Sequence, residues 1–274
     1  GELMHWSIER LIFIAWLAQV VFTPLIALPT DLVDNHFLLL ALSTGAVGAV
    51  AFFILTTTVM RTWHLSWSGL KPHWSGDFNW LIFAGLVVVD AIFTVLNTGE
   101  MPSLHRANWD FTLSAFEAAV MEETLFRFAI LGILFYAWRN VKQRLPLALA
   151  TSSILFGIVH LTNYGPQEWS MTVLQAVSAA GIGLFFATVY VYTGQLWLAM
   201  LMHFLLDWTA FIASDSMLMT GKVTVQDWIG TGIELVVFIG IAVWMMFGQR
   251  RQVMERHVNR LTGEHQRFDF MIQY

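Results

Sequence analysis

The sequence predicts an all-α, polytopic membrane protein with about eight transmembrane helices in one domain covering residues 1–274. Of its 274 residues, 57% are hydrophobic and 12% are charged, and the mean hydropathy is +0.63. A soluble domain carries about 25% charged residues, so these few charges cannot cover a soluble surface. The composition excludes a disordered chain and a basic nucleic-acid-binding protein, and the absence of cysteine excludes disulfides and thiolate chemistry. Membrane lipid is an expected partner and nucleic acid is not.

Eight apolar segments approach or exceed the roughly 20 residues that a bilayer-crossing helix needs. They are residues 8–28, 36–60, 78–98, 109–138, 146–162, 169–193, 195–213 and 226–248. The first is predicted to be a retained span, because its apolar stretch is too long for a signal peptide and no small-residue cleavage site follows it. The fourth would measure about 45 Å as a straight helix. It is therefore expected to tilt, or to begin in the interface around Trp109 and Asp110.

The basic residues predict the orientation of the chain. With eight spans, one side of the membrane would hold eleven of the fourteen Lys and Arg residues. Because positive charge marks cytoplasmic loops, the N- and C-termini are predicted to be cytoplasmic. The polar, basic tail at about 249–274 is expected either to lie on anionic lipid or to be a solvated end.

Nine ionisable groups fall inside the predicted spans. They are Asp90, Glu117, Glu122, Glu123, Asp207, Glu234, His160, His203 and Arg127. An ionisable group at the bilayer centre costs about 2.5–3.5 kcal/mol even on a lenient scale, and groups that persist there usually mark function. No role follows from the sequence for Asp90 and Glu234.

The densest group is Glu122-Glu123-Thr-Leu-Phe-Arg127 in the fourth span. Glu123 and Arg127 are four residues apart, so they lie on one helix face and can pair. Glu122 points about 100° away and has no obvious partner on its own helix, which suits a general base. The alternative is that both glutamates pair with cations on other helices.

Two later segments carry histidines. His160 closes Phe156-Gly-Ile-Val-His160 near the end of the fifth span, and Asn163 follows it. By itself His160 is most simply an interfacial hydrogen-bonding group. His203 and Asp207 are four residues apart in the seventh span and therefore lie on one helix face. Three interpretations are open: a metal site, a histidine with its orienting acid, or a hydrogen-bonded pair between helices. Together with Glu122, these groups would suffice for a hydrolytic site around an activated water.

The three segments resemble the motifs of the CAAX-protease and bacteriocin-processing family. These are intramembrane proteases whose eukaryotic members, the Ras-converting enzymes, trim prenylated proteins. The motifs occur in the same order on separate spans, and the matched region runs from about 109 to 213. The resemblance implies an intramembrane endopeptidase that hydrolyses a peptide bond of a membrane-associated protein or peptide.

The resemblance also implies roles for individual residues. Glu122 would activate the attacking water, and His160 would orient that water or stabilise its charge. His203 would help to bind the oxyanion, where preorganised donors contribute most. Glu123 and Arg127 would form a structural or positioning pair.

Asp207 departs from the family pattern, in which the third motif commonly ends in asparagine. An ionised aspartate repels an oxyanion. Asp207 is therefore either protonated, or an orienting group for His203, or a metal ligand. Asn163 is a candidate for the missing amide donor.

The use of a metal is left open by the sequence. The family is often described as metalloproteases, and Glu122, His160 and His203, with Asp207 in reserve, could bind zinc or another divalent metal. The His-Glu-x-x-His helix of zinc proteases is absent. In the metal-free alternative, which the spacing favours slightly, Glu122 and His160 polarise the water directly.

Two functions of other classes remain. In a proton- or ion-coupled transporter, acidic residues including Asp90, Glu117 and Glu234 would relay protons, but the chain lacks repeated halves with broken helices. In a catalytically silent scaffold or immunity protein, Asp207 would be a degenerate site residue. The intact first motif, Glu122-Glu123-Thr-Leu-Phe-Arg127, counts against a catalytically silent protein.

Overall fold

The computed structural model describes residues 35–62, 65, 76–98, 104–219 and 221–263, and it confirms the all-α fold class. No strand occurs in these residues beyond an isolated bridge between Tyr164 and Gln167. The helices are α2 (Asn35–Thr62), α3 (Trp80–Thr98), α4 (Trp109–Glu123), α5 (Leu131–Ala137), α6 (Arg144–Val159), α7 (Trp169–Thr193), α8 (Leu196–Ser214), α9 (Val225–Met245) and α10 (Gly248–Leu261). Two 3-10 turns, η2 (Leu104–Arg106) and η4 (His160–Asn163), and a π-helical segment, η3 (Thr124–Ile130), complete them.

Six of the described helices are long and apolar enough to cross a membrane, so the protein is an integral membrane protein. They correspond to six of the predicted spans. A seventh, at 109–138, corresponds to α4, η3 and α5, which follow one another without a break from Trp109 to Ala137. This run begins at a polar cap, where Asn108 Oδ1 accepts the Phe111 N–H at 2.8 Å, and Trp109 is exposed. The predicted span at 8–28 lies outside the described residues.

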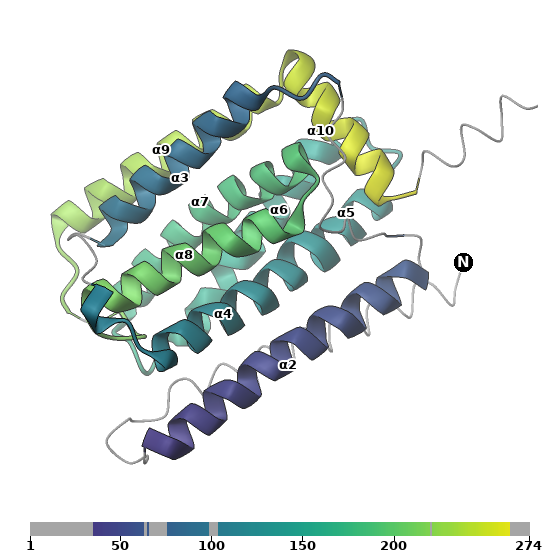
Figure 1. Cartoon of the computed structure of the whole chain (residues 1–274). Helices are drawn as coiled ribbons and strands as arrows, with labels where there is room; N and C mark the ends of the chain where they lie inside the picture. Colours follow the sequence, from purple (N-terminus) through teal and green to yellow (C-terminus); the bar gives the residue numbers. More distant parts are fainter. Residues whose placement is uncertain (1–34, 63–64, 66–75, 99–103, 220, 264–274) are drawn as a thin grey trace, which may run out of the picture.

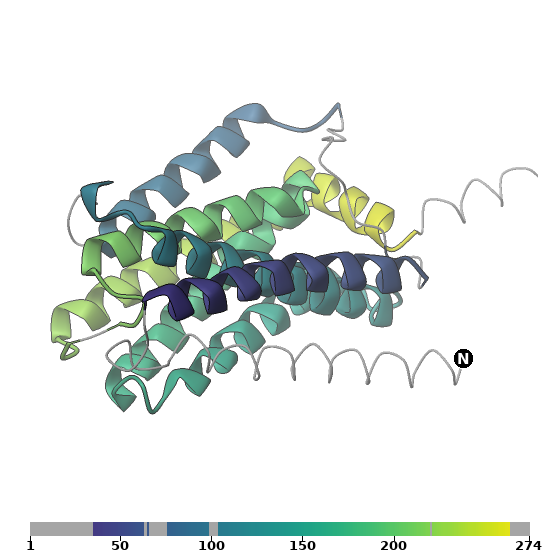
Figure 2. The same ribbon diagram turned by 60° about the horizontal axis from the view of Figure 1, so that its bottom comes forward.

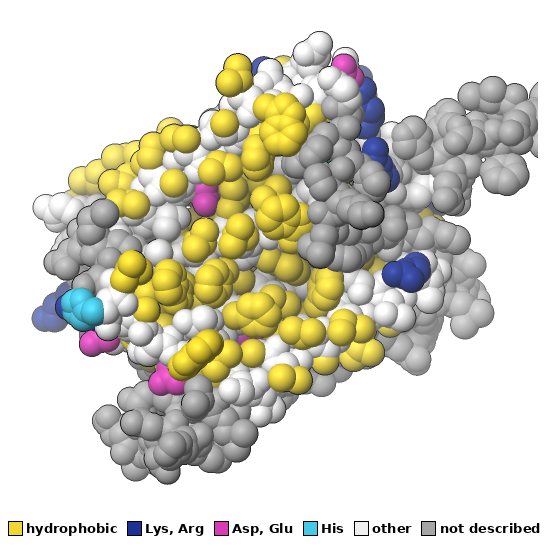
Figure 3. All heavy atoms as spheres, in the orientation of Figure 1, with side chains coloured by type: hydrophobic (Ala, Val, Ile, Leu, Met, Phe, Trp, Pro, Cys, Tyr) yellow, Lys and Arg dark blue, Asp and Glu magenta, His cyan; other side chains and the backbone are white. Residues whose placement is uncertain are grey.

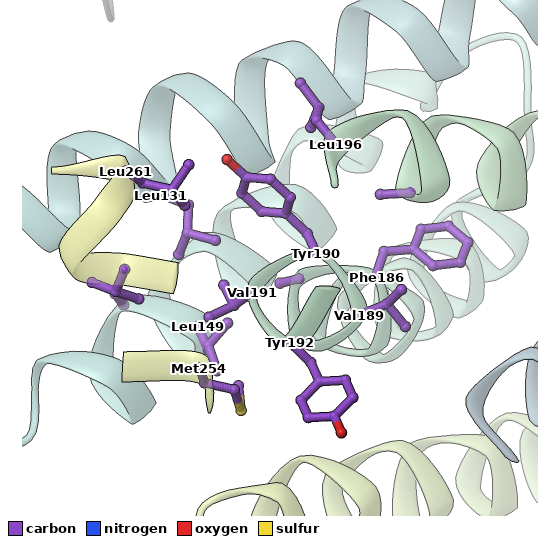
Figure 4. Close-up of a cluster of buried hydrophobic side chains, with 14 of the residues drawn as sticks. Leu131, Leu149, Phe186, Val189, Tyr190, Val191, Tyr192, Leu196, Met254 and Leu261 are labelled. Atoms are coloured by element: carbon purple, nitrogen blue, oxygen red, sulfur yellow. The ribbon is translucent and has the colours of Figure 1, made fainter. Parts of the chain in front are cut away.

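Helix α7 is the centre of the bundle (Figures 1 and 2). It packs against α6, α8, α9 and α10, while α4 lies between α2 and α8. Every α7 residue from Phe185 to Thr193 is buried. Figure 4 shows this stretch with side chains from α5, α6, α8 and α10 packed around it.

Small residues bring α6 and α7 into close contact. A Cβ atom placed on Gly157 of α6 would lie 2.6 Å from the Ala176 carbonyl oxygen and 2.8 Å from the Ala180 Cβ, both on α7. Small residues at such crossings let helix backbones approach closely inside a membrane. This contact fixes the end of α6 that carries Phe156 and His160 against α7.

Helix α10 covers one end of the bundle, so residues 249–261 of the tail predicted at about 249–274 pack against protein and are not a solvated end, while the contact with anionic lipid stays a prediction. Its residues Val253, Met254, Val258 and Leu261 are buried in the core that includes the end of α7 (Figure 4). Arg256 pairs with Asp77 at 2.7 Å, and Arg144 pairs with Glu255 and donates to Asn259. Helix α10 is amphipathic, and its apolar side packs against the bundle. The many basic residues of the segment made this pattern easy to overlook in the sequence.

The face seen in Figure 3 is largely hydrophobic, with most of its charged side chains near its ends. Exposed apolar residues follow α3 and α9, including Leu81, Val88, Leu96 and Val236. An apolar surface of this extent on a soluble protein would aggregate, whereas here it fits lipid. The cytoplasmic placement of the α10 end stays a prediction.

We expect Gly157→Ala to lower the thermal unfolding midpoint of the detergent-solubilised protein. Overpacking a tight contact costs about 1–3 kcal/mol, and the added methyl would overlap the α7 backbone. Gly240→Ala is the matched control, because its Cβ would meet no atom within 4 Å. Equal midpoints for the two variants would contradict the close packing of α6 on α7.

Candidate active site

The two adjacent glutamates lie where the helix changes its hydrogen-bonding pattern. Glu122 and Glu123 end α4, and the next seven residues form the π segment η3. Single-turn π-helical stretches are frequent at functional sites. Ser152 of α6 donates to the Phe126 carbonyl inside η3 at 2.9 Å, which ties this segment to the second motif's helix.

Glu123 is the buried anchor of the cluster. Its Oε2 lies 3.1 Å from Arg127 Nε, so the ion pair predicted from the four-residue spacing is present. Its Oε1 lies 2.9 Å from His203 Nδ1 on α8. The side chains of Glu123 and Arg127 are fully buried and that of His203 is nearly so. An ionised carboxylate can only accept hydrogen bonds. His203 Nδ1 therefore carries a proton and donates a hydrogen bond to Glu123 Oε1.

The other ring nitrogen of His203 faces two carboxylates. Its Nε2 lies 3.3 Å from Asp207 Oδ2 and 3.8 Å from Glu122 Oε2. The side chains of Glu122 and Asp207 keep 17% and 26% of their accessible surface. These two side chains are thus more exposed than Glu123 and Arg127, although Glu122 Oε2 itself is buried, and both carboxylates lie within 4 Å of His203 Nε2.

His160 joins the cluster from α6. It begins η4, and its Nδ1 lies 2.8 Å from the Phe156 carbonyl oxygen, which accepts the ring proton. Its ring lies 4.8 Å from that of Phe156, and the Phe156 ring in turn lies 6.0 Å from that of His203. The three predicted motifs are therefore brought together, although they are carried by three helices and two intervening segments.

Asn163 has a different partner from the one expected for an oxyanion donor. Its Nδ2 donates to Gln175 Oε1 at 2.9 Å, and Gln167 Nε2 donates to the same oxygen at 3.1 Å. These amides connect the loop after α6 to α7. This hydrogen bond gives Asn163 a structural role in the loop. Its catalytic role stays a prediction.

The possible metal ligands are not gathered into a coordination shell in this arrangement. Within the described ranges, no group of three His, Asp or Glu side chains is placed to hold a metal ion. The metal site predicted at Glu122, His160, His203 and Asp207 therefore stays a prediction. The hydrogen bond from His203 Nδ1 to Glu123 is compatible with it, because metal-binding histidines commonly donate their other ring nitrogen to a carboxylate.

Two of the remaining acidic residues of the spans, Glu117 and Glu234, lie against other helices. Glu234 of α9 accepts hydrogen bonds from Asn97 of α3 at 3.1 Å and from Ser178 of α7 at 2.8 Å. The Glu117 carboxylate packs against Gly45 of α2, where a Cβ would overlap it. Glu234 thus links three helices, a role for which the sequence held no local signal because its partners are 56 and 137 residues away.

We expect Glu123→Gln to lower the thermal unfolding midpoint strongly. Removing one partner of a buried ion pair costs about 3–5 kcal/mol, because Arg127 would remain buried without its anion. The double variant Glu123→Gln, Arg127→Met should recover much of the midpoint, since no unpaired buried cation is left. A wild-type midpoint for Glu123→Gln alone would contradict the structural role of this pair.

The comparisons with known proteins agree with the motifs. Residues 105–209, which contain all three motifs, match the Rce1-like family, described as type II CAAX prenyl endopeptidase Rce1-like. No curated protein and no solved structure matches the chain. The resemblance predicted from the motifs is thereby confirmed over this segment. Residues 105–209 of this integral membrane protein are therefore similar to the Rce1-like type II CAAX prenyl endopeptidases.

Proposed function

We propose that the protein is an intramembrane endopeptidase that hydrolyses a peptide bond of a membrane-associated protein or peptide. One observation carries the proposal: the partly exposed side chains of Glu122 and Asp207 lie 3.8 and 3.3 Å from His203 Nε2, and the other nitrogen of this ring contacts Glu123, which is fully buried and paired with Arg127. The family match over the same residues supports the peptidase class. The predicted cytoplasmic placement of both termini belongs to the same proposal.

Glu122 is the proposed general base. Its Oε2 and His203 Nε2 are 3.8 Å apart, so a water can lie within hydrogen-bonding distance, about 2.7–3.0 Å, of both. Glu122 removes a proton as the water oxygen attacks the scissile carbonyl carbon, and it returns that proton to the amine when the C–N bond breaks. His160 assists by orienting the water beside Glu122. One water is consumed, and an amine and a carboxylic acid are released.

His203 is the proposed oxyanion donor. With its Nδ1–H held by Glu123, the imidazolium form presents Nε2–H towards the reacting carbonyl, and Glu123 stabilises the positive charge on the ring. Such preorganised donors are worth about 10²–10³ in kcat. Asp207, 3.3 Å from the same Nε2, orients the ring. It also competes with the oxyanion for that proton.

We expect Glu122→Gln to lower peptide hydrolysis by about 10²- to 10⁴-fold, the usual contribution of a general base, and to leave the thermal midpoint unchanged. The measurement compares the membrane peptides of cells that express wild type or variant, and then the hydrolysis of the peptides so identified in proteoliposomes.

Glu168→Gln is the matched control, since Glu168 is an exposed carboxylate outside the cluster. Full activity of Glu122→Gln would exclude the mechanism. Activity that disappears with a chelator and returns with zinc would replace the metal-free route by a metal-dependent one, with the peptidase function retained.

We expect Asp207→Asn to retain kcat or to raise it. The amide oxygen can still accept from His203 Nε2–H, while the negative charge that competes with the oxyanion is gone. Asp207→Leu removes the acceptor as well and should lower kcat, because the ring loses this contact. If Asp207→Asn is as inactive as Glu122→Gln, then the charge of Asp207 is itself required and the orienting role is wrong.

A further inference from the structure

The Phe156 side chain contacts three polar members of the site at once. Its ring is 2% exposed, and the Arg127 guanidinium carbon lies 4.3 Å from its centroid. The His160 ring lies 4.8 Å away at an interplanar angle of 74°, and the His203 ring lies 6.0 Å away at 89°. These separations are those of edge-to-face aromatic pairs and of cation–π contacts.

The backbone of the same residue holds one of the histidines. The Phe156 carbonyl oxygen accepts the His160 Nδ1 proton at 2.8 Å. The orientation of His160 therefore depends on Phe156 twice, through the ring and through the carbonyl. Any shift of Phe156 moves His160 relative to His203.

The space for the Phe156 ring is left by Gly183 of α7, a helix that carries none of the three motifs. A Cβ atom on Gly183 of α7 would lie 2.8 Å from Phe156 Cδ1 and 3.3 Å from Arg127 Nη2. Gly183 lies within the α7 helix and is not among the glycines with positive φ. Its backbone geometry is therefore open to any residue, and what distinguishes the position is the space beside Phe156 and Arg127.

We infer that Phe156 and Gly183 are positioning residues of the peptidase site: the Phe156 ring sets the relative orientation of His160 and His203, and Gly183 gives that ring its place. The inference rests on the proposed function for its catalytic consequence. A misplacement of about 1 Å in a catalytic constellation can cost about 10²-fold in rate, so a methyl group at Gly183 is enough to test it.

The test compares Gly183→Ala with Gly181→Ala. Gly181 is the matched control on the same helix, because its Cβ would meet the flexible Leu235 side chain of α9, at 3.2 Å, rather than the site. Gly183→Ala should lower kcat by about 10- to 100-fold with KM unchanged, as expected for misplaced catalytic groups, and Gly181→Ala should keep both. Equal kcat values in these two variants would overturn the inference.

A second pair of variants separates positioning from simple packing. Phe156→Leu in the Gly183→Ala background removes the crowding, so the thermal midpoint should recover while kcat stays low. Recovery of wild-type kcat in the double variant would show that the Phe156 ring only fills space and does not position the histidines. If Gly183→Ala fails to fold, Phe156→Leu alone carries the test, with a reduced kcat expected and a wild-type kcat contradicting it.

A readout without substrate distinguishes this inference from the proposed function. Nitrogen-15 spectra of the histidine rings, recorded in lipid nanodiscs, should shift for His160 and His203 in Gly183→Ala and not in Gly181→Ala. If no variant or wild type hydrolyses peptides, the proposed function fails while the spectra still decide the positioning of the two rings. Unchanged spectra in Gly183→Ala would overturn the positioning role.

Discussion

The buried carboxylate of Glu123 is the interaction on which the site depends. A buried ion is tolerated when an opposite charge lies close to it, and Glu123 Oε2 lies 3.1 Å from Arg127 Nε while Glu123 Oε1 contacts His203 Nδ1 at 2.9 Å. These contacts connect the α4–η3 junction to α8. They also place Glu122, the next residue in the chain, beside the second nitrogen of His203. The position of Glu122, the proposed general base, thus follows from the position of Glu123.

Close backbone approach supplies the second constraint. Inside lipid there is little hydrophobic force between helices, so packing and interhelical hydrogen bonds hold them together. The Gly157 contact with Ala176 and Ala180 sets α6 on α7, and Glu234 ties α9 and α3 to α7 through Ser178 and Asn97. Helix α7 carries no motif, yet its contacts determine where the second motif lies.

The sequence predicted what depends on distance along one helix. Apolar segment lengths predicted the six described helices that are long and apolar enough to cross a membrane, and the spacing of Glu123 and Arg127 predicted their ion pair. The contact of Glu123 with His203 joins residues 80 positions apart, and no local period encodes such a pairing. The amphipathic face of α10 was missed because the segment is rich in arginine, and the π segment was missed because its residues are ordinary helix formers.

The unequal exposure of the cluster has a consequence for molecular traffic. Arg127 and Glu123 are fully buried, whereas the side chains of Glu122 and Asp207 keep 17% and 26% of their accessible surface. In the proposed reaction, one water is consumed for every bond cut, and two new chain ends form that become charged at neutral pH. Ionised Glu122 and Asp207 attract the ammonium end and repel the carboxylate end. The carboxylates that would act on the nucleophile would therefore also act oppositely on the two products.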